Sequence, residues 1–227
     1  MTSKPESQRK SNKSRLYLVE DHPVTREGFA QLLNYQPDLE VCGQAGTAAK
    51  ALVGIDTTHP DLVIVDLSLA ESSGLELIKD IKARHPRLPI LVLSTHDEAL
   101  YGERALRAGA RGYVMKQAPT SELMRAIRKV LGGQLWLSES MHTRLVHKHL
   151  HGTSSRKPAS ELENLSDREL EVFQLIGSGL TTRRIAAKLH LSVSTVETYR
   201  AHLKEKLRLA NGMELVRRAV EWVNRQK

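Results

Sequence analysis

Short apolar runs alternate with amphipathic stretches over the first half of the chain. The runs LVIV and ILVL are rich in β-branched residues and contain no polar position, which is typical of parallel strands buried on both faces. The segments between such runs have apolar residues three or four positions apart, the period of a helix. This alternation predicts a parallel α/β sheet with five strand and helix pairs. The expected strands cover 15–20, 40–45, 62–66, 90–94 and 112–115, and the expected helices cover 24–35, 48–55, 75–85, 99–108 and 121–131.

The last part of the chain shows the helical period alone. Ser166, followed three residues later by Glu169, has the capping-box signature of a helix that continues through Ile176. We expect two further short helices over 182–189 and 194–207, with a tight connection between them, and a last helix over 213–223. Four helices in this short stretch predict a small, all-α second domain with few core residues to spare.

A segment rich in Ser, His and basic residues separates the two patterns. Its lack of a sustained apolar period indicates a linker, with one helical piece expected around MHTRLVHKHL. Four histidines raise the possibility of a metal site, but no carboxylate accompanies them, so a solvated basic linker is favoured. These histidines are His142, His147, His149 and His151. The expected division is a disordered basic tail over 1–14, a first domain over 15–133, a linker over 134–160 and a second domain over 161–227.

Charge and cysteine content narrow the class of protein. The formal net charge of +8 and the pI near 9.7 indicate a polyanionic partner, and the basic residues are in excess at both ends while the middle is slightly acidic. The single cysteine, Cys42, excludes an intrachain disulfide and a cysteine zinc site, and it is expected to be a small packed residue. No apolar run approaches the roughly 18 residues of a spanning helix. We therefore expect a cytoplasmic protein that has no membrane partner.

Chemically distinctive residues fall at the carboxyl ends of the expected strands, where ligands bind in doubly wound sheets. Three carboxylates that converge there need a divalent cation and a nearby ammonium to offset their repulsion. Hard oxygen ligands suit Mg²⁺, with Asp21 and Asp66 coordinating directly. Asp66 is then placed to attack a phosphoryl group while Lys116 neutralises charge on its oxygens. The residues at these strand ends are Glu20, Asp21, Asp66, Ser94, Thr95 and Lys116.

Residues 15–133 resemble the receiver domain of two-component response regulators, through the motifs LVEDHP, LVIVDLSL, LVLSTH and GYVMK. The resemblance implies a flavodoxin-like (βα)5 fold with strand order 2-1-3-4-5. It also implies that Asp66 is the phospho-acceptor, that Glu20 and Asp21 form the metal pair, that Ser68 binds the metal through its carbonyl, and that Lys116 stabilises the phosphoryl group. Ser94 and Tyr113 are the implied switch residues. The chain departs from the family at Ala70 and Gln117, where proline is common.

The second and third helices of the last domain have the layout of a helix-turn-helix, whose second helix enters the major groove of DNA. Helical periodicity buries Val196, Leu203 and Leu207, and it turns the opposite face outward. The expected base-reading residues on that face are Glu197, Thr198, Ala201 and Glu205. The expected phosphate contacts, which fix position without reading sequence, are Lys188, Ser194, Thr195, Tyr199, Arg200 and Lys204.

Residues 165–223 resemble the LuxR-type four-helix DNA-binding domain, through LSDRELEV, GLTTRRIAAKLHLSVSTVETYRAHLKEKL and ELVRRAV. Together, the two resemblances identify the chain as similar to response regulators of the NarL/FixJ class. They imply a cognate histidine kinase, double-stranded promoter DNA and a homodimer formed on phosphorylation. The family often has lysine at the position of Glu197 and histidine at that of Tyr199, so a different operator is expected. The implied dimer helix contributes Leu215, Val216, Ala219 and Val220, although these residues also suit a domain core.

Three functions fit these features. The leading hypothesis is a transcription factor that a histidine kinase regulates by phosphorylating Asp66. A DNA-binding regulator whose receiver no longer responds is the first alternative, which Ala70 leaves open. A Mg²⁺-dependent phosphohydrolase is the second, but Ser68 stands two residues after Asp66, where a second carboxylate is needed to protonate a leaving group.

Overall fold

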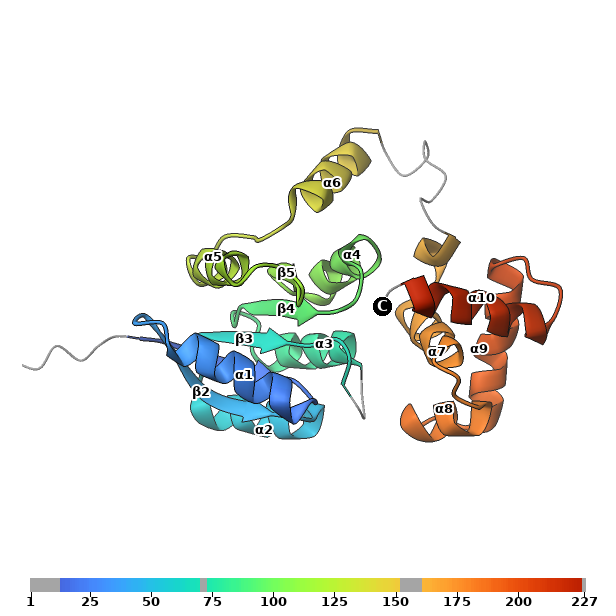
Figure 1. Cartoon of the computed structure of the whole chain (residues 1–227), viewed down its shortest axis with the longest axis horizontal. Coiled ribbons are helices and arrows are strands. Elements are labelled where there is room, and N and C mark those ends of the chain that lie inside the picture. Colours follow the sequence, from blue (N-terminus) through green and yellow to red (C-terminus); the bar gives the residue numbers. More distant parts are fainter. Residues whose placement is uncertain (1–12, 70–72, 152–160, 226–227) are drawn as a thin grey trace, which may run out of the picture.

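The computed structural model describes residues 13–69, 73–151 and 161–225 (Figure 1). Most of the predicted basic tail, Ala70 and linker residues 152–160 lie outside the described residues. The first domain is a five-stranded parallel sheet in the order β2-β1-β3-β4-β5, which confirms the predicted fold and strand order. The strands are β1 Ser14–Val19, β2 Leu39–Ala45, β3 Leu62–Val65, β4 Ile90–Ser94 and β5 Gly112–Met115.

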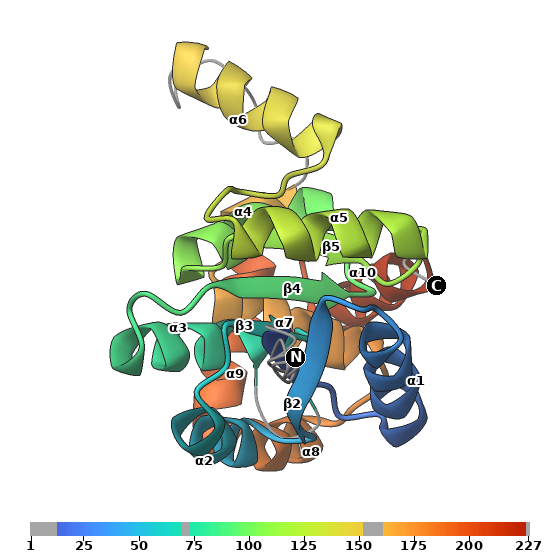
Figure 2. The same ribbon diagram turned by 90° about the vertical axis from the view of Figure 1, so that its left-hand side faces the viewer.

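Helices cover both faces of this sheet (Figure 2). Side chains alternate along each central strand, so that Val63 and Val65 of β3 pack on one face, and Leu62 and Ile64 on the other. One face is covered by α2, α3 and α4, and the other by α1 and α5. These helices are α1 Pro23–Asn34, α2 Ala48–Thr58, α3 Gly74–Arg84, α4 Glu98–Ala108 and α5 Thr120–Leu131.

The predicted boundaries differ from the observed ones most at α2, which continues three residues beyond the expected end at Ile55. The hydroxyl of Thr58 donates to the carbonyl oxygen of Gly54, so the polar residues extend the last turn. The helix ends at His59, whose φ of 47° lies in the left-handed region.

The second domain consists of a short 3-10 turn, η1, and four helices. The predicted capping box at the start of α7 is present, because Ser166 accepts from the backbone of Glu169 and the Glu169 carboxylate accepts from the backbone of Ser166. Lys206 donates to the same carboxylate at 2.7 Å and joins the third helix to the first. The elements are η1 Glu161–Asn164, α7 Asp167–Gly177, α8 Thr182–Lys188, α9 Val193–Lys206 and α10 Gly212–Arg225.

The linker contains one helix, α6 Glu139–His151, in the segment where a helical piece was expected. Just before it, Trp136 forms a parallel bridge with Gly112 at the edge of β5. Met141 then packs on Gly102 of α4, and Arg144 donates to the carbonyl oxygen of Ala99. The first part of the linker is therefore attached to the sheet domain. No helix in the described ranges is long and apolar enough to cross a membrane.

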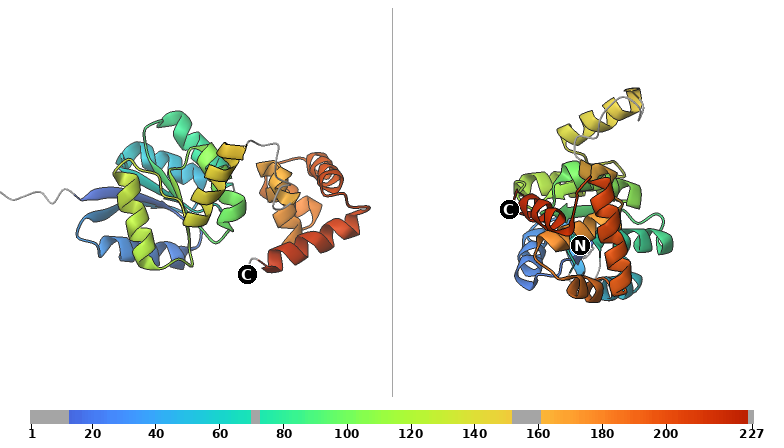
Figure 3. Two further views of the ribbon diagram at one scale, coloured as in Figure 1. Left: turned by 90° about the horizontal axis from the view of Figure 1, so that it is seen from above. Right: turned by 90° about the vertical axis from the view of Figure 1, so that its right-hand side faces the viewer.

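The two domains form separate lobes that meet at the carboxyl end of the sheet (Figures 1 and 3). Asp167, at the start of α7, accepts from Arg104 of α4 at 2.9 Å and from Lys79 of α3 at 3.3 Å. Tyr101 of α4 donates to the side-chain oxygen of Gln174 in α7 at 3.0 Å. Arg104 also donates to the carbonyl oxygen of Leu162 in η1 at 3.2 Å. Helix α7 and the 3-10 turn before it thus contact the first domain.

Close packing of α7 on α10 predicts that Gly177→Ala destabilises the second domain. A Cβ at this position lies 2.3 Å from the carbonyl oxygen of Ala219, so the two backbones must move apart. We expect a loss of about 2 kcal/mol in the free energy of unfolding, measured by urea denaturation followed by circular dichroism.

The matched control is Gly28→Ala in α1, where no atom lies within 4 Å of the added Cβ. This change should stabilise the protein by about 0.5–1 kcal/mol, because alanine loses less backbone entropy in a helix than glycine does. Equal unfolding midpoints for the two variants would contradict the close helix contact.

Candidate functional site

A buried ion cluster lies at the carboxyl ends of β1, β3 and β5. Asp66 follows β3, Glu20 follows β1, and their side chains are only 2% exposed. The ammonium of Lys116, directly after β5, donates to Glu20 Oε2 at 2.5 Å and to Asp66 Oδ2 at 2.8 Å. Three strand ends far apart in the chain thus bring these charged groups together, as the sequence predicted.

Lys116 is held in its charged form by this arrangement. Burial by itself lowers the pKa of a lysine, but here the charge and hydrogen bond of Asp66, followed by those of Glu20, outweigh that effect and raise the pKa of Lys116. One cation therefore faces two carboxylates in direct contact. The cluster keeps a net negative charge even before Asp21 is counted.

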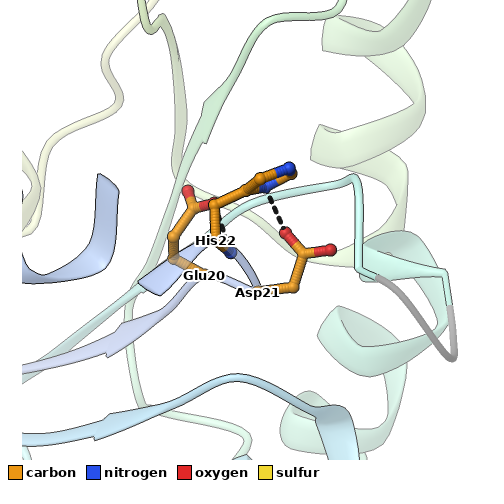
Figure 4. A group of neighbouring side chains, drawn as sticks. All are labelled: Glu20, Asp21 and His22. Carbon is orange, nitrogen blue, oxygen red and sulfur yellow. Dashed lines mark hydrogen bonds and ion pairs between the residues drawn. The ribbon is translucent and has the colours of Figure 1, made fainter. Parts of the chain in front are cut away.

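Asp21 offers the free ligand of this site. Within the described residues its buried Oδ1 accepts no hydrogen bond, and Nδ1 of His22 lies 2.7 Å away as an ion-pair contact (Figure 4). Ligand atoms of Glu20, Asp21 and His22 all lie within 4.8 Å of one another. The surplus of carboxylate oxygens and the orphaned Oδ1 fit a hard divalent cation such as Mg²⁺. The sequence analysis missed His22, although its position directly after the two acids was the available signal.

Ser68, two residues after Asp66, lies beside the cluster. The backbone N–H of Ser68 donates to Asp66 Oδ1 at 3.2 Å, and Ser68 forms a bridge with Ser73 across the loop. This contact fixes Ser68 beside the acceptor carboxylate, where its carbonyl was expected to act as a ligand.

The expected switch residues separate into two groups. Ser94 is fully buried at the end of β4, and Tyr113 is 1% exposed with its hydroxyl donating to the carbonyl oxygen of His96 at 2.7 Å. Burial is the main reason that the pKa of Tyr113 is raised. Thr95, in contrast, has an exposed side chain. Consecutive residues at a strand end point in different directions, so Thr95 does not share the buried position of Ser94, and its expected place at the phosphoryl group stays a prediction.

His96 is a part of the site that the sequence analysis missed. Its ring is stacked on Tyr101 with centroids 4.6 Å apart, and its Nε2 lies 2.8 Å from the hydroxyl of Ser68. Burial lowers the pKa of His96; the charge of Asp66 opposes this shift, and that of Lys116 adds to it. The imidazole is therefore placed beside the acceptor loop, at the contact between the domains.

The second domain presents the outward face of α9 as predicted. Val196, Leu203 and Leu207 are buried, with exposures of 0%, 0% and 4%. The four expected base-reading residues, Glu197, Thr198, Ala201 and Glu205, are all exposed. The carboxylate of Glu197 lies 3.6 Å from Arg200, which keeps a cation beside it on the same face.

The start of α9, where phosphate contacts are expected, lies one residue earlier than predicted. The helix begins at Val193, and its cap is Ser192, whose hydroxyl accepts from the backbone N–H of Thr195. Ser194 therefore lies in the first turn, one residue after the start of the helix, and its hydroxyl contacts that of Ser192. Lys188 is exposed, whereas Tyr199, Arg200 and Lys204 are half-buried. Exposed Arg183 and Arg184 add positive charge on α8 that the sequence analysis overlooked.

Two of the four expected dimer residues on α10 are core residues. Leu215 and Ala219 are 0% exposed, because this side of the helix packs on α7 and α9. Val216 is 39% exposed and Val220 is half-buried, so the accessible apolar face of α10 is narrower than predicted. Met213, which is 83% exposed, extends that face at its start.

Comparisons with known proteins agree with this division of the chain. Residues 16–128 match the response regulator receiver domain, and residues 163–219 match the bacterial regulatory proteins of the luxR family. The chain is 37% identical over 213 residues to the oxygen regulatory protein NreC of Staphylococcus haemolyticus, covering 91% of this chain and 97% of that protein.

Solved structures show the same architecture. RcsB from Salmonella enterica serovar Typhimurium, bound to a promoter in the presence of the phosphomimetic BeF3-, is 25% identical with a TM-score of 0.67, over 92% of this chain and 98% of that one. A structure of two RcsB dimers on two parallel DNAs is 26% identical with a TM-score of 0.55, over 91% and 97% of the chains.

The ion cluster predicts that Lys116→Met destabilises the protein in the absence of divalent cations. The substitution leaves Glu20 and Asp66 buried without their ammonium, at a cost of about 3 kcal/mol in the free energy of unfolding. Millimolar Mg²⁺ should restore part of this loss, and more than it adds to the wild type. Urea denaturation with and without Mg²⁺ measures both effects.

The control is Lys50→Met on the exposed side of α2, which should change stability by no more than about 0.5 kcal/mol. A Lys116→Met variant as stable as this control would contradict the role of the ammonium.

Proposed function

The chain belongs to the response regulators that join a receiver domain to a LuxR-type DNA-binding domain, and from this premise we propose how its residues perform that function. As a DNA-binding response regulator, it has a phosphoryl-accepting domain and a helix-turn-helix domain in one chain. The observation that supports the assignment most strongly is the buried contact of Lys116 with both Asp66 and Glu20 at the carboxyl edge of the sheet.

We propose that Asp66 accepts a phosphoryl group from a phosphohistidine of a histidine kinase. A carboxylate oxygen of Asp66 forms a bond to phosphorus while the P–N bond breaks, and the leaving imidazole nitrogen takes up a proton. Lys116, already 2.8 Å from Asp66, is positioned to stabilise the phosphoryl oxygens. Ser94, buried at the end of β4, lies at the strand end next to Asp66 and supplies a hydroxyl donor.

Mg²⁺ is the proposed cofactor, held by Glu20, Asp21, Asp66 and the carbonyl of Ser68. When bound, the cation neutralises charge on the transferring phosphoryl group. The orphaned Oδ1 of Asp21 and the surplus negative charge of the cluster support this assignment. Asp21 is the ligand that needs the least rearrangement, because the Lys116 ammonium pairs with Glu20 and Asp66 and, among the described residues, leaves Asp21 unpaired with it.

Phosphorylation is proposed to shift the receiver between two arrangements and to favour a homodimer. The buried hydroxyls of Ser94 and Tyr113 are the proposed switch groups. Ser94 ends β4 and Tyr113 lies on the neighbouring β5, so both are close to the edge of the sheet where the phosphoryl group adds negative charge. The dimer contact is proposed on the accessible face of α10, through Val216 and Val220. Promoter DNA is the proposed ligand of the dimer, as the RcsB structure with its promoter supports by similarity.

The outward face of α9 is proposed to read base edges in the major groove. Thr198, Ala201 and Glu205 are exposed there, and Glu197 stands beside them as an acceptor suited to cytosine N4. Basic side chains on α8 and α9 surround this face and fix it on the phosphate backbone.

The proposal also includes the division of the chain. The receiver domain is proposed to cover 15–133 and the DNA-binding domain 161–227, and the protein is proposed to act in the cytoplasm.

The central test is the solution mass in Mg²⁺ with and without beryllofluoride, measured by sedimentation. We expect the wild type to shift from monomer to dimer on addition of beryllofluoride, because the mimic occupies the phosphoryl position on Asp66. Asp66→Asn should stay monomeric, and the control Asp80→Asn, on the exposed side of α3, should behave as wild type.

A dimer that forms equally well without beryllofluoride, or in Asp66→Asn, would favour a regulator that does not depend on phosphorylation. A wild type that stays monomeric with the mimic bound would contradict the proposed dimer.

A second test concerns sequence recognition by Glu197. Glu197→Ala should relax the preference at one base pair of the operator, corresponding to about 1–3 kcal/mol of discrimination, as measured by selection from randomised DNA. Glu221→Ala, an exposed carboxylate on α10, is the control and should leave the profile unchanged. An unchanged profile for Glu197→Ala removes this residue from the base-reading set.

A further inference from the structure

One polar chain connects the acceptor loop to the second domain through His96. The backbone N–H of Ser68 donates to Asp66 Oδ1, and the hydroxyl of Ser68 lies 2.8 Å from Nε2 of His96. The amide nitrogen of Gln174 in α7 lies 3.3 Å from the same Nε2 and 3.4 Å from Nδ1 of the imidazole. Three consecutive contacts therefore lead from Asp66 to the DNA-binding domain.

Both ends of the Gln174 amide are engaged at this contact. Its nitrogen donates to His96, and its oxygen accepts from the hydroxyl of Tyr101 at 3.0 Å. The ring of Tyr101 in turn stacks on His96. His96 is only 9% exposed and its carbonyl accepts from Tyr113, so neither its backbone nor its ring is free to turn away.

The contact between the domains leaves the proposed DNA-reading surface uncovered. Thr198, Ala201 and Glu205 on α9 are exposed in the full chain, although α7 is docked on the receiver. Docking therefore does not act by hiding the recognition helix. Instead, the docked helix α7 is connected to the phosphoryl acceptor Asp66 through Ser68 and His96.

We propose that His96 is a positioning residue through which Gln174 holds the Ser68 loop in its resting arrangement and disfavours loading of Asp66. This inference rests on the proposed function of Asp66. A phosphoryl group adds nearly two negative charges and three acceptor oxygens beside Ser68, so the loop must adjust when Asp66 is loaded. If phosphorylation of Asp66 weakens the contacts from Ser68 through His96 to Gln174, then these contacts weaken phosphorylation by the same factor, because coupling between two sites is reciprocal.

The test measures beryllofluoride affinity by calorimetry, in saturating Mg²⁺, on the full-length protein. Gln174→Ala and His96→Ala should each bind beryllofluoride about two- to tenfold more tightly than the wild type, the range expected for losing one or two ordinary hydrogen bonds. The double variant should bind no more tightly than either single variant, because both act through one chain. If His96 and Gln174 only supported the shape of the site, their loss would distort it, and the variants would bind beryllofluoride more weakly than the wild type.

Two further variants separate the His96 contact from general docking. Tyr101→Phe removes only its hydrogen bond to Gln174, so it should tighten binding less than Gln174→Ala does. Gln31→Ala, an exposed glutamine on α1, is the matched control and should bind as the wild type. Equal effects of Tyr101→Phe and Gln174→Ala would overturn the role of His96.

The remaining outcomes are decisive. Unchanged or weaker binding by Gln174→Ala, or additive effects in the double variant, would overturn the inference while leaving the proposed function intact. Absence of binding in the wild type, or equal binding in Asp66→Asn, would overturn the proposed function and this inference with it.

Discussion

The contact of one buried ammonium with two buried carboxylates determines how the first domain is organised. Lys116 meets Glu20 and Asp66 only because β1, β3 and β5 are parallel and end at the same edge of the sheet. Like charges a few ångströms apart in a poorly hydrated site repel strongly, so the ammonium stabilises the fold at the same point where the proposed chemistry takes place. Among the described residues, Oδ1 of Asp21 is buried beside this pairing and accepts no hydrogen bond, which suits the cation site proposed for it. The groups that stabilise this edge of the sheet are thus the same ones to which the reactivity is assigned in the proposed function.

The position of this edge also explains how the domains communicate. Helices α3 and α4 start beside the ion cluster, and they supply Lys79, Tyr101 and Arg104 to the contact with α7. A change at Asp66 therefore has a short route to the second domain, through side chains that are already packed. The recognition helix lies outside this contact, with its outward face accessible. The docked arrangement of α7 therefore leaves the outward face of α9 accessible in this structure.

Much of the fold and of the acidic site was predictable because both depend on local patterns. The LVIV and ILVL runs located two central strands, and Asp66 and Ser94 at their ends followed directly. Helical periodicity was less decisive for α10, where Leu215 and Ala219 fit a core and an interface equally well until α7 was in place. The exposure of Thr95 was likewise not predictable, since the direction of a residue just beyond a strand is not encoded in its spacing.

The pairing of His96 with Gln174 could not be predicted. These residues are 78 positions apart and belong to different domains, and neither has a motif that indicates the other. Their contact depends on how α7 docks, which is decided by Asp167 with Arg104 and Lys79 and by the stacking of Tyr101. Only the arrangement of the two domains in space reveals it.

The most direct measurement of the central claim is chemical trapping of the phosphorylated residue. The protein is incubated with Mg²⁺ and a small phosphoryl donor such as acetyl phosphate, reduced with borohydride, digested and analysed by mass spectrometry. Reduction converts an aspartyl phosphate to homoserine, and we predict homoserine at position 66 alone. Homoserine at another aspartate, or an unmodified Asp66 under conditions that phosphorylate a known receiver, would contradict the assignment of Asp66 as the acceptor.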